Sequence, residues 1–154
     1  MDKITIRKAT TMDLPTLLEF EQNIIQAERP FDPTIKNGHI NYYNIAEMIE
    51  ANDVEVGVAE LDNKIIGSGY AKIEVSKPYL KNERHAYLGF MYIIPEQRGK
   101  GLNKRIIEFL KLWAASQNIN EFRLEVYVEN DAAIKAYEKC GFSKHLLEMR
   151  MSIE

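Results

Sequence analysis

The feature that most constrains this chain is a short glycine-containing loop that joins an apolar segment to a long amphipathic one. Residues 86–94 form an uninterrupted apolar and aromatic run that ends at Pro95, which predicts a central strand buried on both faces. After Gly101, apolar residues recur at helical spacing. The first N–H groups of a helix lack partners within it, and the helix dipole places about half a positive charge there. The junction therefore predicts a site for an anion such as a phosphate.

Two other phosphate motifs do not fit this loop. A dinucleotide fingerprint beginning at Gly99 requires a glycine at position 104, where the chain has Lys104. A P-loop using Gly99 and Lys100 requires Ser or Thr next, but Gly101 follows. The remaining alternative is a glycine-rich turn whose basic neighbours bind nothing.

The rest of the chain predicts a mixed α/β (α+β) fold in a single domain, residues 1–154. Strand-like patterns cover residues 4–7, 54–61, 64–75, 86–94, 121–128 and 146–153. Helices are expected after an N-cap at Thr11, at 45–50, after Gly101 and at 132–139. The first of these helices has an apolar face made of Leu14, Leu17, Leu18 and Ile25. A strand–helix–strand crossover requires one parallel pair in a mostly antiparallel sheet, flanked by about four helices.

Composition limits function only broadly. A chain with 45% hydrophobic and 28% charged residues is typical of a globular domain. No apolar run approaches the roughly 18 residues of a membrane span, and residues 1–7 lack the apolar core of a signal peptide. A net charge of −3 argues against nucleic acid as a partner. The single Cys140 cannot form an internal disulfide, which is typical of a cytoplasmic protein. Together these features predict a cytoplasmic protein with no nucleic-acid or membrane partner.

Two stretches resemble the signatures of the GNAT N-acetyltransferase superfamily. Residues 98–103, RGKGLN, are similar to Arg/Gln-x-x-Gly-x-Gly/Ala, and residues 130–142 match Asn-x-x-Ala-x-x-x-Tyr-x-x-x-Gly-Phe in the same order and spacing. Residues 93–95 are similar to the strand end that precedes the family's first signature. One position departs from the pattern, because Asn103 stands where the family has Gly or Ala.

The resemblance implies an enzyme that transfers acetyl from acetyl-CoA, its co-substrate, to a primary amine by direct attack, without a metal. It implies a GNAT-like twisted sheet whose parallel strands splay at the cofactor site. It assigns cofactor contacts to Ile93, Arg98, Gly99, Lys100, Gly101, Leu102, Asn103, Asn130 and Ala133. It places the thioester carbonyl against the backbone amide of Met91, where a preorganised donor would stabilise the oxyanion. Gly89 is expected to mark the bulge beside that amide.

The resemblance also makes Tyr137 the general acid that protonates the departing thiolate. Tyr137 shares a helix face with Ala133, Ala136 and Cys140, a pattern that a core residue would also give. Asn130 is also a good helix N-cap residue.

The acceptor side is less defined. Some relatives have a glutamate base on the central strand, where this chain has Tyr87. The remaining base candidates are Glu28, Asp32, His85, Glu125 or a chain of water molecules. An aromatic, anionic acceptor pocket would combine Glu28 and Asp32 with Tyr42, Tyr43 and Tyr79.

The acceptor itself, a small molecule or a peptide amine, and the choice between monomer and homodimer stay open. Two further interpretations remain: an acetyl-CoA-binding sensor or regulatory module with little turnover, and an interaction domain without a cofactor.

Overall fold

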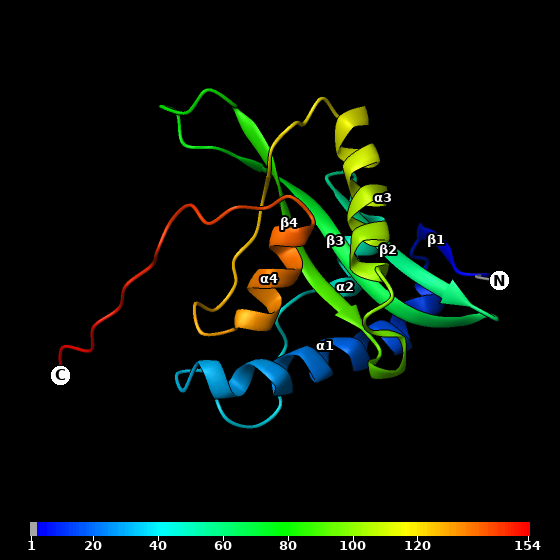
Figure 1. Cartoon of the computed structure of the whole chain (residues 1–154), viewed down its shortest axis with the longest axis horizontal. Coiled ribbons are helices and arrows are strands. Elements are labelled where there is room, and N and C mark those ends of the chain that lie inside the picture. Colours follow the sequence, from blue (N-terminus) through cyan, green and yellow to red (C-terminus); the bar gives the residue numbers. More distant parts are fainter. Residues whose placement is uncertain (1–2) are drawn as a thin grey trace.

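A five-stranded sheet in the order β1-β2-β3-β4-β5 forms the centre of the protein, seen in a computed structural model (Figure 1). The structure describes residues 3–154, so the first two residues of the predicted domain and of the amino-terminal segment lie outside it. The strands are β1 Thr5–Lys8, β2 Val54–Leu61, β3 Lys64–Val75, β4 Arg84–Ile93 and β5 Phe122–Arg123. The helices are α1 Leu14–Glu28, α2 Ile45–Glu50, α3 Leu102–Ser116 and α4 Asp131–Lys139. Short 3-10 turns occupy Thr11–Asp13, Arg29–Phe31 and Pro95–Gln97.

Neighbouring strands from β1 to β4 are antiparallel, whereas β5 runs parallel to β4. The β2–β3 hairpin turns at Asp62 and Asn63, which both adopt left-handed backbone conformations (φ 51° and 64°). The predicted mixed α/β fold is therefore confirmed, with its single parallel pair and, within residues 3–154, four α-helices.

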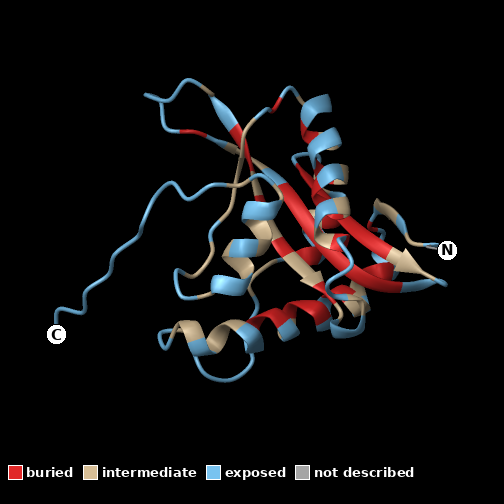
Figure 2. Ribbon diagram, viewed as in Figure 1, coloured by how far each residue is buried: buried red, intermediate tan, exposed pale blue. Residues whose placement is uncertain are grey.

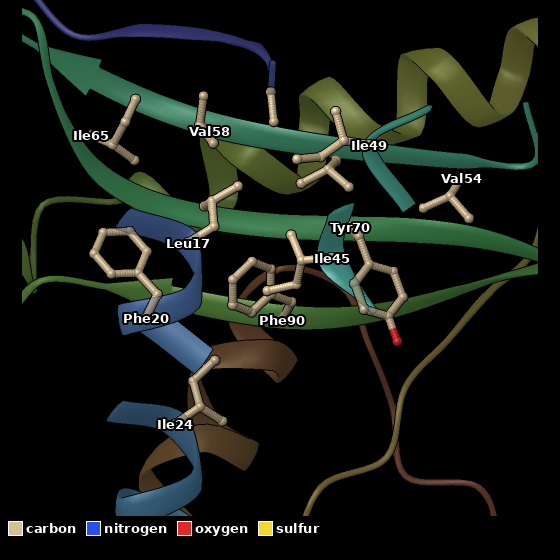
Figure 3. Packing of buried hydrophobic residues seen from close by; sticks show 12 residues of the cluster. Leu17, Phe20, Ile24, Ile45, Ile49, Val54, Val58, Ile65, Tyr70 and Phe90 are labelled. Carbon is tan, nitrogen blue, oxygen red and sulfur yellow. The ribbon is translucent and has the colours of Figure 1, made fainter. Parts of the chain in front are cut away.

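Each face of the sheet buries its own apolar cluster. On one face, α1 and α2 pack Leu17, Phe20 and Ile45 against strand residues such as Phe90 (Figure 3). On the other face, α3 buries residues such as Ile106 against the sheet. Figure 2 shows the result, with the middle of the sheet buried and the outward helix surfaces exposed. The central strand β4 therefore lies between two cores.

The first helix differs from its predicted form at two points. Thr10, not Thr11, precedes the first helical turn, and its N–H donates to Asp13 Oδ2 at 2.8 Å. Leu18 was expected in the core but is 43% exposed, while Phe20 is buried. The reason is geometric: the buried stripe of α1 centres on Leu17, Phe20 and Ile24, which places residue 18 on the outer side.

One predicted strand is shorter than expected and another is wrong. In the 121–128 segment the strand is limited to Phe122 and Arg123, with the Glu121 carbonyl also accepting from the Ala86 N–H, and residues 146–153 form no strand. Beyond α4 the chain runs away from the sheet (Figure 1). Both segments alternate in polarity, but alternation records two faces of a strand and says nothing about whether a neighbouring strand is present. Among the described residues, no helix has the length and apolar character needed to cross a membrane.

Candidate active site

The loop between β4 and α3 presents a row of unpaired backbone amides. Gly99 and Gly101 have positive φ values of 77° and 78°, a conformation that favours glycine. The first helical bond of α3 runs from the Arg105 N–H to the Gly101 carbonyl, and no side chain caps the helix. Within residues 3–154, the amides of residues 99–104 have no hydrogen-bond partner. The loop therefore offers several free donors together with the positive end of a helix dipole.

The basic side chains of this loop have structural partners. Arg98 Nε donates to the Ile93 carbonyl oxygen at 2.8 Å, and its guanidinium lies 5.5 Å from the centre of the Tyr92 ring. Lys100 Nζ donates to Gln97 Oε1 at 3.1 Å. Arg98 thus ties the loop to the end of β4, so the backbone supplies most of the anion-binding geometry.

A bulge interrupts β4 immediately before Met91. Tyr70 of β3 pairs with Gly89 and Ser68 pairs with Tyr92, so β4 contains one residue more than β3 over this stretch. That residue is Phe90, whose φ of 57° lies in the left-handed region. Gly89 is next to the bulge for a different reason, because a Cβ there would lie 2.6 Å from the Tyr70 ring. The bulge was predicted at Gly89, and the structure puts the distorted backbone one residue later.

The bulge lies where β4 and β5 separate. The two strands pair only at Ala86 with Phe122 and at Tyr87 with Arg123. From residue 88 onward, β4 has no strand on that side among the described residues. The backbone around Met91 therefore lies beside the opening between the parallel strands.

Helix α4 follows the segment after β5, and its Tyr137 and the adjoining Phe142 pack against the apolar cluster that α3 covers. Asn130 is its N-cap, and its side-chain oxygen accepts from the Ala133 N–H at 3.2 Å. The Tyr137 ring packs edge-on against Phe142, with ring centroids 5.9 Å apart. Burial, followed by the negative charge of Glu28, raises the pKa of Tyr137 to about 12. Tyr137 is thus a half-buried, neutral phenol whose hydroxyl has no hydrogen-bond partner in residues 3–154.

Comparison with known proteins decides the family. The sequence model of the acetyltransferase (GNAT) family matches residues 21–142. The chain belongs to this family. Its matched region contains the β4–α3 loop, the bulge and α4, so the geometry described above lies within the residues that the family model matches.

Individual relatives of this GNAT chain are distant. A streptothricin acetyltransferase from Escherichia coli is 34% identical over 85 residues, covering 55% of this chain and 45% of the relative. An N-alpha-acetyltransferase from Saccharolobus solfataricus is 26% identical over 145 residues, covering 91% of this chain and 80% of the relative. The crystal structure of a predicted acetyltransferase with acetyl-CoA from Clostridium acetobutylicum is 22% identical, covers 96% of both chains and has a TM-score of 0.72. The fold is therefore shared over nearly the whole chain.

The pKa values of two carboxylates on the predicted acceptor side are shifted in opposite directions. Burial raises the pKa of Glu28, and the nearby Tyr42 hydroxyl opposes this effect. Hydrogen bonds from Thr34, helped by Arg150, lower the pKa of Asp32 to about 2. Asp32 also accepts from the Tyr127 hydroxyl at 3.2 Å. Asp32 is therefore an ionised carboxylate with several hydrogen-bond partners, whereas Glu28 is a weaker acid whose charge contributes to the raised pKa of Tyr137.

Tyr87 lies beside another carboxylate. Its hydroxyl donates to Glu125 Oε1 at 3.1 Å. Burial and the Glu125 charge raise the pKa of Tyr87, so the phenol stays protonated and cannot act as a base. A glutamate is thus present next to position 87, although it comes from the segment after β5.

The other predicted acceptor residues are less well placed. His85 is buried, with Nδ1 2.8 Å from Ser76 Oγ and Nε2 3.3 Å from Glu74 Oε1. Both ring nitrogens are engaged, which leaves neither available for an amine. Tyr79 is 77% exposed in the β3–β4 loop, at the end of the sheet opposite the β4–α3 loop (Figure 1). In residues 3–154 no cluster of three or more His, Cys, Asp or Glu side chains could hold a metal.

Sequence reasoning missed Glu21, which fixes the wall between α1 and α2. Its side chain is fully buried, and Oε2 accepts from the amides of Tyr42 and Tyr43 at 2.6 and 2.7 Å. Tyr43 in turn packs against Tyr70 and Phe90. A signal existed, because Glu21 is four residues from both Leu17 and Ile25 and so lies on the apolar face of its helix.

Proposed function

We propose that this chain is an N-acetyltransferase that moves the acetyl group of acetyl-CoA to a primary amine by direct attack in a ternary complex. The observation that carries the proposal is the run of unpaired amides at residues 99–104, next to a bulged strand and a neutral tyrosine. The GNAT family supports the acetyltransferase activity, and relatives carry names such as streptothricin acetyltransferase and N-alpha-acetyltransferase.

In this proposal the cofactor lies across the opening between β4 and β5. The amides of residues 99–103 bind the pyrophosphate, because free N–H groups at a helix start favour an anion. Ile93, Asn130 and Ala133 line the path of the pantetheine arm. The Met91 amide donates to the thioester carbonyl, where negative charge develops as the amine attacks. The C–N bond forms, the C–S bond breaks and the thiolate leaves.

Tyr137 would assist the departure of the thiolate mainly as a hydrogen-bond donor. Its pKa of about 12 lies roughly 3.5 units above that of a thiol, so complete proton transfer to the thiolate is uphill by roughly 5 kcal/mol. A hydrogen bond to a charged group contributes about 1.5–3 kcal/mol. We therefore expect Tyr137→Phe to lower kcat by about 10- to 100-fold.

Glu28 is the carboxylate that we propose for the amine. The ammonium form must lose a proton before it attacks, and a base works best when its pKa is closer to the working pH. Burial raises the pKa of Glu28, whereas the pKa of Asp32 is lowered to about 2. Both ring nitrogens of His85 lie against polar groups, Nδ1 against Ser76 and Nε2 against Glu74. The effect of Glu28 on the pKa of Tyr137 supports a position for both near the reacting groups.

A thiol-release assay over a panel of primary amines tests the proposal. The panel would contain aminoglycosides, streptothricin, polyamines, amino acids and peptides with free amino termini. We expect thiol release with at least one class of amine. The rate should be lower in Tyr137→Phe and in Glu28→Gln. It should be unchanged in Tyr79→Phe, which removes a phenol hydroxyl from an exposed loop. Tight acetyl-CoA binding without release for any amine would instead support the regulatory module.

A further inference from the structure

A continuous row of tyrosine rings lies on the sheet face that α1 and α2 cover. Tyr42 and Tyr43, just before α2, have ring centroids 5.7 Å apart. Tyr43 lies 5.5 Å from Tyr70 of β3, and Tyr70 lies 6.5 Å from Tyr87 of β4. These rings pack in or against the apolar cluster of this face, and the Tyr70 hydroxyl points away from its apolar neighbours (Figure 3). Such a row can pack a methylene chain and attract a cation to its ring faces.

A carboxylate lies at each end of this tyrosine row. At the Tyr42 end, burial and then Glu28 raise the pKa of the phenol. The Tyr42 hydroxyl oxygen is buried and makes no hydrogen bond in the part of the chain that the structure describes, so its lone pairs can accept from an ammonium group beside Glu28. At the other end, the Tyr87 hydroxyl donates to Glu125 Oε1 at 3.1 Å. Two anionic groups therefore bracket the row.

Neither of these carboxylates has a cationic partner. Within residues 3–154, Glu28 and Glu125 form no ion pair. Other carboxylates of the chain do have arginine partners, and these are Asp13, Asp32, Glu60 and Glu121. The chain thus neutralises several of its acidic groups and leaves unpaired the two at the ends of the tyrosine row.

The basic side chains near the row do not supply the missing charge. Arg29 donates to two backbone carbonyls of the following loop. Arg123, which pairs with Tyr87 across β4 and β5, is bound to Glu121 at 2.7 Å. Lys72, across from Tyr87 in β3, is exposed. The charges that act most strongly on Tyr87 are negative and help burial to raise its pKa, so this end of the row favours a cation.

We propose that the acceptor is a linear aliphatic diamine or polyamine, whose reacting amine lies at Glu28 and whose second ammonium group lies at Glu125. The inference rests on the proposed function, which puts Glu28 beside the reacting amine. The methylene chain would lie along Tyr43 and Tyr70. The second ammonium group keeps its proton and contacts the Tyr87 ring, where cation–π attraction adds to the ion pair. A monoamine would leave Glu125 without a partner.

Amines of equal length test the role of the second ammonium group. Steady-state kinetics would compare octanediamine with octylamine, and spermidine would follow as a natural polyamine. We expect kcat/KM for octanediamine to be about 5- to 30-fold higher, from one exposed ion pair together with one cation–π contact. The preference should disappear for propanediamine over propylamine, because so short a chain cannot reach both carboxylates. An octanediamine preference of twofold or less, which two equivalent reactive ends give by number alone, would overturn the proposal.

A charge-neutral substitution then assigns the preference to one residue. Glu125→Gln should lower kcat/KM for octanediamine about 3- to 10-fold more than for octylamine. Glu129→Gln is the matched control, since it removes the same charge from the same segment, and it should leave the ratio unchanged. Both side chains are exposed, so both variants should keep the circular dichroism spectrum of the parent. If residue 125 were the general base, Glu125→Gln would lower kcat for both amines equally, and that result would contradict the proposal.

Binding measurements separate this inference from the proposed function. Absence of thiol release with every amine would refute the acetyltransferase activity of the chain. Titration of octanediamine into the CoA-bound protein would still report on the site, since binding that weakens in Glu125→Gln and not in Glu129→Gln supports a diamine site. Equal affinity for octanediamine and octylamine would overturn the inference, even where both amines are acetylated.

Discussion

Replacing Gly101 by alanine tests whether the β4–α3 loop requires the left-handed backbone conformation of this residue or only the space beside it. Gly101 has a φ of 78°, and a Cβ there would meet no atom within 4 Å. Alanine therefore causes no clash, and its cost is the left-handed conformation, about 1–2 kcal/mol. The amides of residues 99–104 have no protein partners among the described residues, so few contacts oppose relaxation of residue 101 to a negative φ before CoA binds.

Binding of CoA would then have to restore the left-handed form. A cost of about 1–2 kcal/mol corresponds to a roughly 5- to 30-fold higher Kd for CoA, which titration calorimetry would measure. Gly38→Ala is the matched control, because Gly38 has a φ of 83° and the same open space but lies in the loop before α2. It should lower the free energy of unfolding and leave the Kd unchanged. A Kd for Gly101→Ala within twofold of the parent would refute the role of these amides.

Three other predictions concern buried polar groups. Glu21→Gln should lower the free energy of unfolding, measured in urea, by about 1–2 kcal/mol. The new NH₂ group would take the place either of Oε2, which accepts from two amides, or of Oε1, which has no partner. The variant should also raise KM for the amine and leave the Kd for CoA unchanged. Asp13→Asn breaks a two-bond pair with Arg7 and should cost about 1–2 kcal/mol, discounted because Arg7 is 32% exposed. Since Arg7 lowers the pKa of Asp13, that stabilisation is complete above about pH 3.9 and is lost as the pH falls through the lower folded value; the variant should therefore show a flatter acid denaturation curve. Tyr137, with a pKa of about 12, stays protonated up to about pH 10, so a kcat–pH profile that falls below pH 9 in the parent but not in Tyr137→Phe would contradict its assignment.

Local patterns were enough to predict elements whose hydrogen bonds are local. The structure reproduces the predicted bounds of β2, β3 and α2, because a tight turn at Asp62 and Asn63 sets one register and an N-cap at Asn44 starts the helix. The β4–α3 loop could also be predicted, since a buried run, two glycines and a helical stripe follow one another directly.

Features that depend on distant contacts could not be predicted. The alternation in residues 121–128 and 146–153 is real, but the presence of a neighbouring strand is decided elsewhere in the chain. A glycine in a strand suggests a distorted backbone, which is why the sequence predicts the bulge at Gly89, whereas the Tyr70 ring is what requires a glycine there. Arg98 was expected to face an anion, and only the structure shows its bond back to Ile93.

The bulge in β4 also means that one residue of this strand lies outside the pairing register with β3. Phe90 is inserted without changing the phase of the strand, since Leu88, Met91 and Ile93 all face the α3 core on either side of it. A strand without residue 90 would pair with β3 in unbroken register. Loss of a single codon would thus remove the distorted backbone before the Met91 amide and leave the remaining residues of β4 in place. The same deletion would remove a buried side chain that packs against Tyr43, so on this fold the distorted backbone and the core depend on one residue.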